Sequence, residues 1–391
     1  MVKTGAWQAL ERQKLAPERP NQVAPLPVPG IWVEGHIVFS ATRGDSRNIW
    51  QIPIAPGIFQ ISGASQQLTS GTGMEGDPSL VYGGPGGKTP RLVFSSLTEN
   101  GDIWSVPMDT NYAKVLGEVQ RLTQDVASDI RPSITGDGTK MVFNSNRLGN
   151  WDVWIKDLRT GKETALAATP ADELNPKISL DGSIVVYAIG EGQNAATYAI
   201  PAGGGIPRKV CDHCYAWPPS ADGKRMPFPT RGRLWMLDIA SGKETELGPL
   251  PGTAIRLSWD DHWVTFYGGL EPGHTKLFIL PIGERPATEQ DLIEVTDGSG
   301  YDIVPEFSPD GNLLYFFSQR DGARCLWAQR LDPGTKRPAG SPFPVQHFHS
   351  ARLSTLTVKS GQRALSVARD KIVFTMDERL GNIWMADSEA R

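Results

Sequence analysis

The sequence repeats one short pattern along almost its whole length, and this repeat constrains the fold more than any other feature. Each copy has two or three apolar residues, a polar residue, a gap rich in Gly, Asn and Asp, an aromatic residue and a second apolar run. The aromatic residues of the eight copies are Trp50, Trp104, Trp154, Tyr198, Trp235, Phe278, Trp327 and Trp384. A repeat of this kind predicts a chain built from one supersecondary unit.

Each copy has the residue types of a β-hairpin, with apolar strands on both sides of a turn. Most copies follow a third short strand and a tight turn, often with an Asp-Gly pair such as Asp137-Gly138, and Gly tolerates a positive φ. A segment such as Leu122-Thr123 indicates a fourth strand. The aromatic residues lie 37 to 57 residues apart, close to the spacing of propeller blades. We therefore predict an all-β fold, an eight-bladed β-propeller of four-stranded antiparallel blades.

The last copy ends at Arg391 without an outer strand, so another segment must complete the ring. An open ring would leave a free strand edge, and we expect a strand between Trp7 and Val28 to pair there. This gives two regions: residues 1–28, an N-terminal extension that takes part in ring closure, and residues 29–391, the propeller. Deletion of residues 1–28 is then expected to lower the melting temperature by many degrees.

Composition excludes some classes of partner. The net charge is −4 and Lys and Arg are scattered, so we expect no nucleic-acid partner. No apolar run approaches the ~18 residues of a membrane span, and the first residues lack the pattern of a signal peptide, so we expect no direct membrane insertion. Three cysteines are too few for a disulfide framework.

The stretches "PEFSPDGNLLYF" and "NPKISLDGSIVVY" resemble the Pro-Asp-Gly repeat of TolB-like β-propellers. The resemblance extends from about residue 29 to 387. The sequence also resembles the propeller found as the C-terminal region of some bacterial serine/threonine kinases and transcription regulators. TolB itself has six blades and an N-terminal α/β domain, whereas this sequence has eight copies and no such domain. For the compartment, the resemblance implies a periplasmic or extracytoplasmic location if the chain belongs to a longer membrane-anchored protein, and a cytoplasmic one otherwise.

Four acidic residues precede the Pro of a first strand by three positions: Glu75, Asp129, Glu173 and Asp302. In a propeller this loop leads to the innermost strand, so repetition predicts a partial acidic ring near one mouth of the central channel. Such a ring could hold a cation or the amino end of a peptide. Alternatively, each carboxylate accepts backbone N–H bonds in its own turn.

The segment "CDHCYAWPP" aligns with the same loop, which places Cys211 and Cys214 near that mouth. A Cys-x-x-Cys pair is half of a zinc site, but a local disulfide or two free thiols remain open as alternatives. Trp217 follows these residues and is our best candidate for a residue that stacks on a ligand, with loop packing as the alternative.

In "VQHFHS", His347 and His349 are two positions apart and would point to the same face of a strand. With Gln346 they resemble the manganese site of propeller-type oligogalacturonate lyases, although the spacing differs from that family's pattern. The resemblance implies a divalent metal as cofactor, and the alternative is a pair of half-exposed histidines without a ligand.

No Gly-x-Ser-x-Gly motif, P-loop or dinucleotide fingerprint occurs in the sequence. We therefore expect a non-catalytic binding or sensing module whose ligand binds at the channel mouth. Apart from the metal considered above, we expect no cofactor. Its ligand would be a peptide, a small saccharide or a protein partner, and the domain would be monomeric. The alternatives are a metal-dependent polysaccharide lyase and a scaffold for protein–protein interaction.

Overall fold

The computed structural model describes residues 27–33, 35–43, 46–58, 60–82, 90–190, 194–271, 273–350 and 352–387. Their regular structure is β, with short 3-10 turns such as η2 (Glu289–Asp291) and η3 (Ser360–Gln362). None of the described helical segments is long and apolar enough to cross a membrane. The chain forms two compact units: residues 1–99 with 379–391 make unit 1, and residues 100–378 make unit 2.

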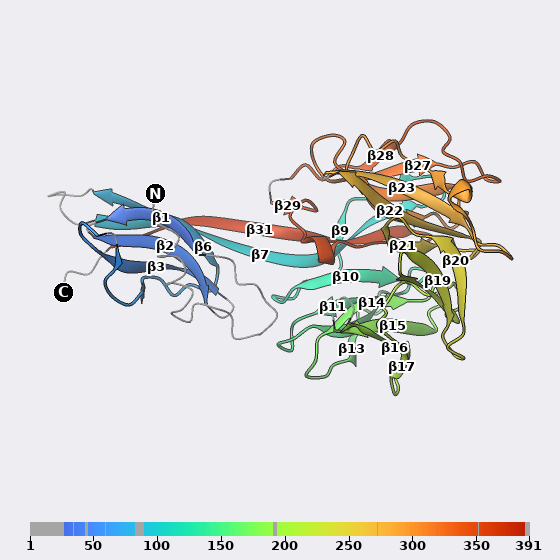
Figure 1. The fold of residues 1–391 in the computed structure, drawn as a ribbon, viewed down its shortest axis with the longest axis horizontal. Coiled ribbons are helices and arrows are strands. Elements are labelled where there is room, and N and C mark those ends of the chain that lie inside the picture. Colours follow the sequence, from blue (N-terminus) through green and yellow to red (C-terminus); the bar gives the residue numbers. More distant parts are fainter. Residues whose placement is uncertain are drawn as a thin grey trace. The chain divides into compact units, whose positions relative to one another are not determined.

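Unit 2 contains five separate antiparallel sheets with the strand order of propeller blades (Figure 1). The first comprises β10 (Asp129–Ile134), β11 (Lys140–Ser145), β12 (Asp152–Asp157) and β13 (Glu163–Ala167). The second comprises β14 (Glu173–Ile178), β15 (Ile184–Ile189), β16 (Ala196–Pro201) and β17 (Arg208–Asp212). The third comprises β18 (Arg225–Thr230), β19 (Arg233–Asp238) and β20 (Glu244–Pro249). The fourth comprises β21 (Thr253–Leu257), β22 (Trp263–Glu271), β23 (His274–Pro281) and β24 (Ile293–Glu294). The fifth comprises β25 (Ile303–Phe307), β26 (Leu313–Ser318), β27 (Cys325–Arg330) and β28 (Phe343–Gln346).

A further group of strands, the closing strands, lies between the fifth and the first blade. The group consists of β30 (Leu365–Val367), β8 (Lys114–Val115), β9 (Gln120–Arg121), and the parts of β7 (Pro90–Asp109) and β31 (Lys371–Asp387) that belong to unit 2. Phe374 of β31 packs in one apolar cluster with Tyr315 of the fifth blade. Val373 packs in another with Phe143 of the first blade. Similar clusters join each blade to the next, so the core of unit 2 is a ring.

The prediction of eight blades is wrong, because the part of the chain that the structure describes forms five. Two of the expected hairpins, at residues 91–109 and 371–387, are instead parts of the long strands β7 and β31, which pair with each other (Figure 1). Pairing with a neighbour satisfies the backbone groups of both strands without a turn in either. Because β31 does not turn back, Trp384 is 55% exposed instead of lying between blades.

The predicted closure by an N-terminal strand is also corrected. Among the described residues, β31 pairs with β7, which begins at Pro90, and with β29 (Leu353–Ser354) and β30. Residues 1–26 of the predicted closing segment lie outside the described residues. Val28, near the predicted boundary between residues 28 and 29, begins β1 (Val28–Val33) and pairs with Ser40 of β2.

Unit 1 is a sheet around a small core. Besides β1 it contains β2 (His36–Arg43), β3 (Ser46–Ala55), β4 (Gln60–Ile61), β5 (Gln66–Gln67), β6 (Met74–Tyr82), and the remaining parts of β7 and β31. Phe39, Trp50 and Ile52 are buried in one apolar cluster of this unit.

A β-bulge recurs in the innermost strands of four blades of unit 2. The bulged residues Arg131, Asn175, Ala254 and Val304 have φ of 56°, 53°, 58° and 54°. The pairing register shifts at each of these positions. A positive φ is unfavourable for a β-branched residue such as Val304, so the fold imposes this geometry. The residues that follow each bulge therefore occupy equivalent positions around the ring.

Candidate metal centre and the predicted ligand residues

The fifth blade brings together four side chains that can bind a metal. Asp321 lies in the turn between β26 and β27, Cys325 is the first residue of β27, and His347 and His349 follow β28. Leu326 pairs with Gln346, so the residues after β28 lie beside Cys325. The backbone N–H of Phe348 donates to Cys325 Sγ at 3.3 Å.

Both imidazole rings converge on one carboxylate oxygen. His347 Nδ1 donates to Asp321 Oδ2 at 2.8 Å, and His349 Nε2 donates to the same oxygen at 3.0 Å. Desolvation acts to raise the pKa of Asp321, but these hydrogen bonds outweigh it and lower the pKa. The side chains of His347, His349 and Asp321 are 52%, 50% and 21% exposed, so a metal ion could reach them from solvent.

The donor set fits a transition metal. One donor atom from each of Asp321, Cys325, His347 and His349 lies within 4.8 Å of all the others. Oxygen, sulfur and nitrogen donors at Zn²⁺ distances of about 2.0–2.3 Å would stand closer together than this, so binding requires only a small contraction. Asp321 Oδ1 is buried and has no hydrogen-bond partner, which leaves one carboxylate oxygen available.

Cys325 differs from the other three donors because it is fully buried. Desolvation raises the pKa of its thiol to about 11. Phe348, between the two histidines, is also buried and packs against Phe374 at 5.0 Å between ring centroids. This anchor turns both flanking imidazoles to the same side, where their centroids are 5.0 Å apart.

A cavity of about 600 Å³ adjoins the two histidines. Its lining is mainly apolar and comprises Trp104, Val119, His347, Phe348, His349, Ser350, Leu353 and Met376. Trp104 Nε1 is buried without a hydrogen-bond partner. The cavity is of the size that small-molecule sites have in proteins.

The predicted acidic residues of unit 2 lie at the starts of innermost strands, and all three are buried with local partners. Asp129 and Asp302 accept hydrogen bonds from Arg147 at 3.1 Å and Arg320 at 2.5 Å. Glu173 accepts a hydrogen bond from the Thr169 hydroxyl within its own turn. Burial raises the pKa of Asp129 and of Glu173.

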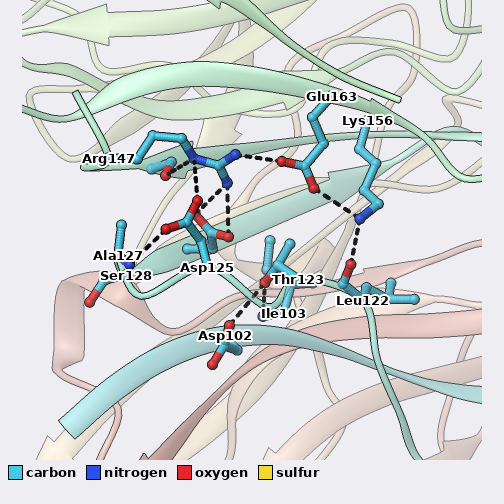
Figure 2. Close-up of polar contacts among 12 residues, drawn as sticks. Asp102, Ile103, Leu122, Thr123, Asp125, Ala127, Ser128, Arg147, Lys156 and Glu163 are labelled. Atoms are coloured by element: carbon cyan, nitrogen blue, oxygen red, sulfur yellow. Dashed lines mark hydrogen bonds and ion pairs between the residues drawn. The ribbon is translucent and has the colours of Figure 1, made fainter. Parts of the chain in front are cut away.

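Arg147 binds several carboxylates at once. Figure 2 shows its guanidinium between Asp125 and Glu163. The distances are 3.5 Å to Asp125 and 2.5 Å to Glu163. Lys156 bonds Glu163 at 2.9 Å and the Leu122 carbonyl at 2.6 Å. The carboxylates of this network are therefore paired with Arg147 and Lys156. Asp129 has no exposed surface for a ligand.

Glu75 belongs to unit 1 and is likewise buried. It accepts hydrogen bonds from Asn48 Nδ2 at 3.1 Å and from the Thr69 hydroxyl. Of the four acidic residues, Glu173 also accepts a backbone N–H bond within its turn, from Thr169 at 3.2 Å, whereas the partners described for the other three are side chains.

Cys211 and Cys214 form a disulfide, so their sulfur atoms are not available as metal ligands in this structure. Trp217 is half-buried, and its ring packs edge-on to Tyr215 at 6.3 Å between centroids. It contacts the apolar clusters on both sides of the third blade. The channel there is lined by Pro218 and Pro219 instead.

Sequence reasoning identified the two histidines but missed Asp321 and Cys325. Both come from the neighbouring hairpin, in "RDGARC", where Asp-Gly has the pattern of a turn. The pairing of β27 with β28, the strand before the histidines, was the signal that could have placed Asp321 and Cys325 beside His347 and His349.

Comparison with known proteins supports the fold. No protein-family model matches the sequence, and no curated protein matches it. A TolB from Agrobacterium tumefaciens is 18% identical over 72% of this chain and 99% of its own, with a TM-score of 0.54. TolB from Acinetobacter baumannii is 15% identical over 79% of this chain and 81% of its own, with a TM-score of 0.47. An oligogalacturonate lyase in complex with manganese is 15% identical over 77% of this chain and 87% of its own, with a TM-score of 0.41. The fold is therefore a TolB-like β-propeller.

Proposed function

We propose that this TolB-like propeller is a metal-dependent binding module. A transition-metal ion of the Zn²⁺ type is held by Asp321, His347 and His349, with Cys325 as the fourth donor. The adjoining cavity takes the apolar part of a small ligand. The observation that carries the proposal is the convergence of two imidazole nitrogens and a carboxylate on one point at the edge of this cavity.

The choice of metal follows from the donors. Imidazole and thiolate favour Zn²⁺ and similar ions over Mg²⁺ or Ca²⁺, which prefer oxygen. When bound, the ion would supply a Lewis-acidic position for an oxygen or nitrogen atom of the ligand. His347 and His349 orient that position, and the buried Phe348 between them fixes the orientation of both rings.

The lining of the cavity indicates the class of ligand. Among the described residues that line it, none is Lys, Arg, Asp or Glu. Trp104, Leu353 and Met376 instead favour an aromatic or aliphatic group. A polyanionic saccharide would lack cationic contacts in this cavity, which favours the binding role over the polysaccharide lyase.

Isothermal titration calorimetry of Zn²⁺ into chelator-treated protein tests the metal site. We expect about one equivalent to bind, and His349→Ala or Asp321→Asn to weaken binding at least ~100-fold because each removes a ligand. His262→Ala is the matched control, since His262 is exposed and lies near Asp260 outside the cluster. Equal zinc affinity in wild type and His349→Ala would refute the assignment.

The ligand cavity has its own test. An apolar fluorescent dye such as 8-anilinonaphthalene-1-sulfonate should bind the wild type, and Leu353→Glu should weaken binding because it places a charge in the apolar lining. Unchanged dye binding in this variant would contradict the cavity as the ligand site even if zinc binds.

A further inference from the structure

One residue from each innermost segment of unit 2 occupies the same position around the central channel. The bulges described above bring Ser133, Lys177, Arg256 and Glu306 into equivalent pairing positions on β10, β14, β21 and β25. The closing strand β30 and the third blade supply the remaining two. The complete ring, the channel ring, consists of Ser133, Lys177, Pro218, Arg256, Glu306 and Ser366, and all six residues line one cavity of about 40 Å³.

Two serine hydroxyls of the channel ring accept hydrogen bonds from the backbone. Ser133 Oγ accepts the Ile178 N–H at 3.2 Å, and Ser366 Oγ accepts the Ile134 N–H at 3.1 Å. A hydroxyl that accepts from the backbone keeps its own hydrogen for another partner. Both hydroxyls can therefore donate to a group in the cavity.

The two cations of the channel ring differ in their partners. Arg256 donates through Nε to Glu306 and through Nη1 to the Ile255 carbonyl at 2.9 Å. Lys177 is only 3% exposed, and its ammonium has no hydrogen bond or ion pair with any described residue. A buried charge without a partner is costly, so a complementary anion would stabilise it.

We propose that the channel ring binds a small oxyanion, a carboxylate or phosphate group, between Lys177 and Arg256. Glu306 neutralises Arg256, so the protonated form of Lys177 supplies the positive charge for the ligand. Ser133 and Ser366 supply further hydrogen bonds. A cavity of about 40 Å³ exceeds the ~10–15 Å³ that one water needs, so it has room for a group of this size.

The charges around Lys177 also predict how binding depends on pH. Burial lowers the pKa of Lys177 strongly, Arg256 on β21 and Arg131 on β10 lower it further, and Glu306 on β25 raises it. Asp261, after β21, also lines the cavity. An anion favours the charged amine, so binding should take up a proton and become tighter as the pH falls.

Calorimetry with sodium acetate and with inorganic phosphate, at constant ionic strength in chloride, tests the proposal. Between pH 8 and pH 6 the wild type should bind at least one of the two saturably, with a dissociation constant on the order of 1 mM for so small a probe. Tighter acetate identifies a carboxylate site and tighter phosphate a phosphate site. Repeating the titrations in two buffers with different enthalpies of ionisation measures the proton uptake, because the observed heat then differs between the buffers.

Lys177→Met should weaken binding at least ~10-fold and abolish the proton uptake, because the amine of Lys177 is the group that takes up the proton. Lys336→Met is the matched control, since Lys336 is 5% exposed, bonds Asn312 and does not line the cavity. Ser366→Ala is a milder second variant and should weaken binding severalfold. The absence of saturable binding in wild type, or unchanged binding in Lys177→Met, would overturn the proposal, and neither result bears on the zinc site.

Discussion

Replacement of Arg147 by Leu tests how the buried carboxylates are stabilised. Asp129 is fully buried, and Arg147 is its cationic partner. Removing one member of a buried ion pair costs about 3–5 kcal/mol. We expect the lower end, because the Arg147 side chain is 16% exposed and Asp129 keeps a hydrogen bond from Ser145.

A second contact adds to this loss. The Arg147 guanidinium lies over the Trp154 ring at 4.4 Å from its centroid, and such a contact contributes about 0.5–1 kcal/mol. The total is then about 3–4 kcal/mol. In a domain of more than 150 residues each kcal/mol shifts the melting temperature by about 2–4 °C, so we expect a decrease of about 10 °C.

The loss should depend on pH. Burial raises the pKa of Asp129, and without Arg147 this pKa rises further. A carboxyl group whose pKa is raised in the folded state favours folding below that pKa, and this advantage is lost as the pH rises through it. The difference between wild type and Arg147→Leu should therefore be larger at pH 7.5 than at pH 4.5.

Differential scanning calorimetry at both pH values measures the effect. Arg159→Leu is the control, because Arg159 is 74% exposed and 4.0 Å from an exposed carboxylate, and it should leave the melting temperature unchanged. The double variant Arg147→Leu/Asp129→Leu should recover most of the loss, since no buried charge remains unpaired. A decrease below ~1 kcal/mol that is equal at both pH values would refute the reasoning.

Three further predictions concern the closing strands and the fifth blade. Phe374→Ala should lower the free energy of unfolding in urea by about 3–5 kcal/mol, because Phe374 is fully buried, whereas Leu380→Ala, at a 48% exposed position, should change it little. Tyr315→Phe should cost about 1–2 kcal/mol in the same assay, since the Tyr315 hydroxyl donates to the Thr110 carbonyl at 2.6 Å, and no measurable loss would contradict this. The Cys325 thiol, with its pKa raised to about 11 by burial, should react with a disulfide reagent at pH 8 far more slowly in native protein than in urea, and rapid native labelling would show that the thiol is accessible.

The sequence predicted the blades well where a short gap lies between two strands. In "NSNRLGNWD" the gap forms the β11–β12 turn, and Gly149 there has a φ of 107°. It failed at Asn100-Gly101 and Gly381-Asn382, which have equally good turn residues. When a partner strand is present, a turn and a continuous strand both satisfy the hydrogen bonds of the backbone. The partner strands here, β7 and β31, are more than 250 residues apart in the sequence.

Candidate sites followed the same rule. His347 and His349 were found because they are close in sequence, whereas Asp321 was missed because a long-range strand pairing brings it to them. The acidic residues were placed near the mouth of the channel from the repeat alone. Their partners Arg147 and Arg320, at equivalent places in two copies of the repeat, already indicated that these carboxylates are neutralised within their blades.

Closure of unit 2 by β7 and β31 has a consequence during protein synthesis. The Thr110 hydroxyl donates to the Ala368 carbonyl across a sequence separation of 258 residues. At about 5–20 residues per second, a ribosome needs on the order of 10–50 s to make the intervening chain. Throughout that time β7 lacks its partner strand β31, and the first blade has an uncovered apolar face, which is the condition that attracts chaperones and mispairing with other nascent chains. Synthesis of β31 therefore determines when unit 2 stops depending on cellular protection.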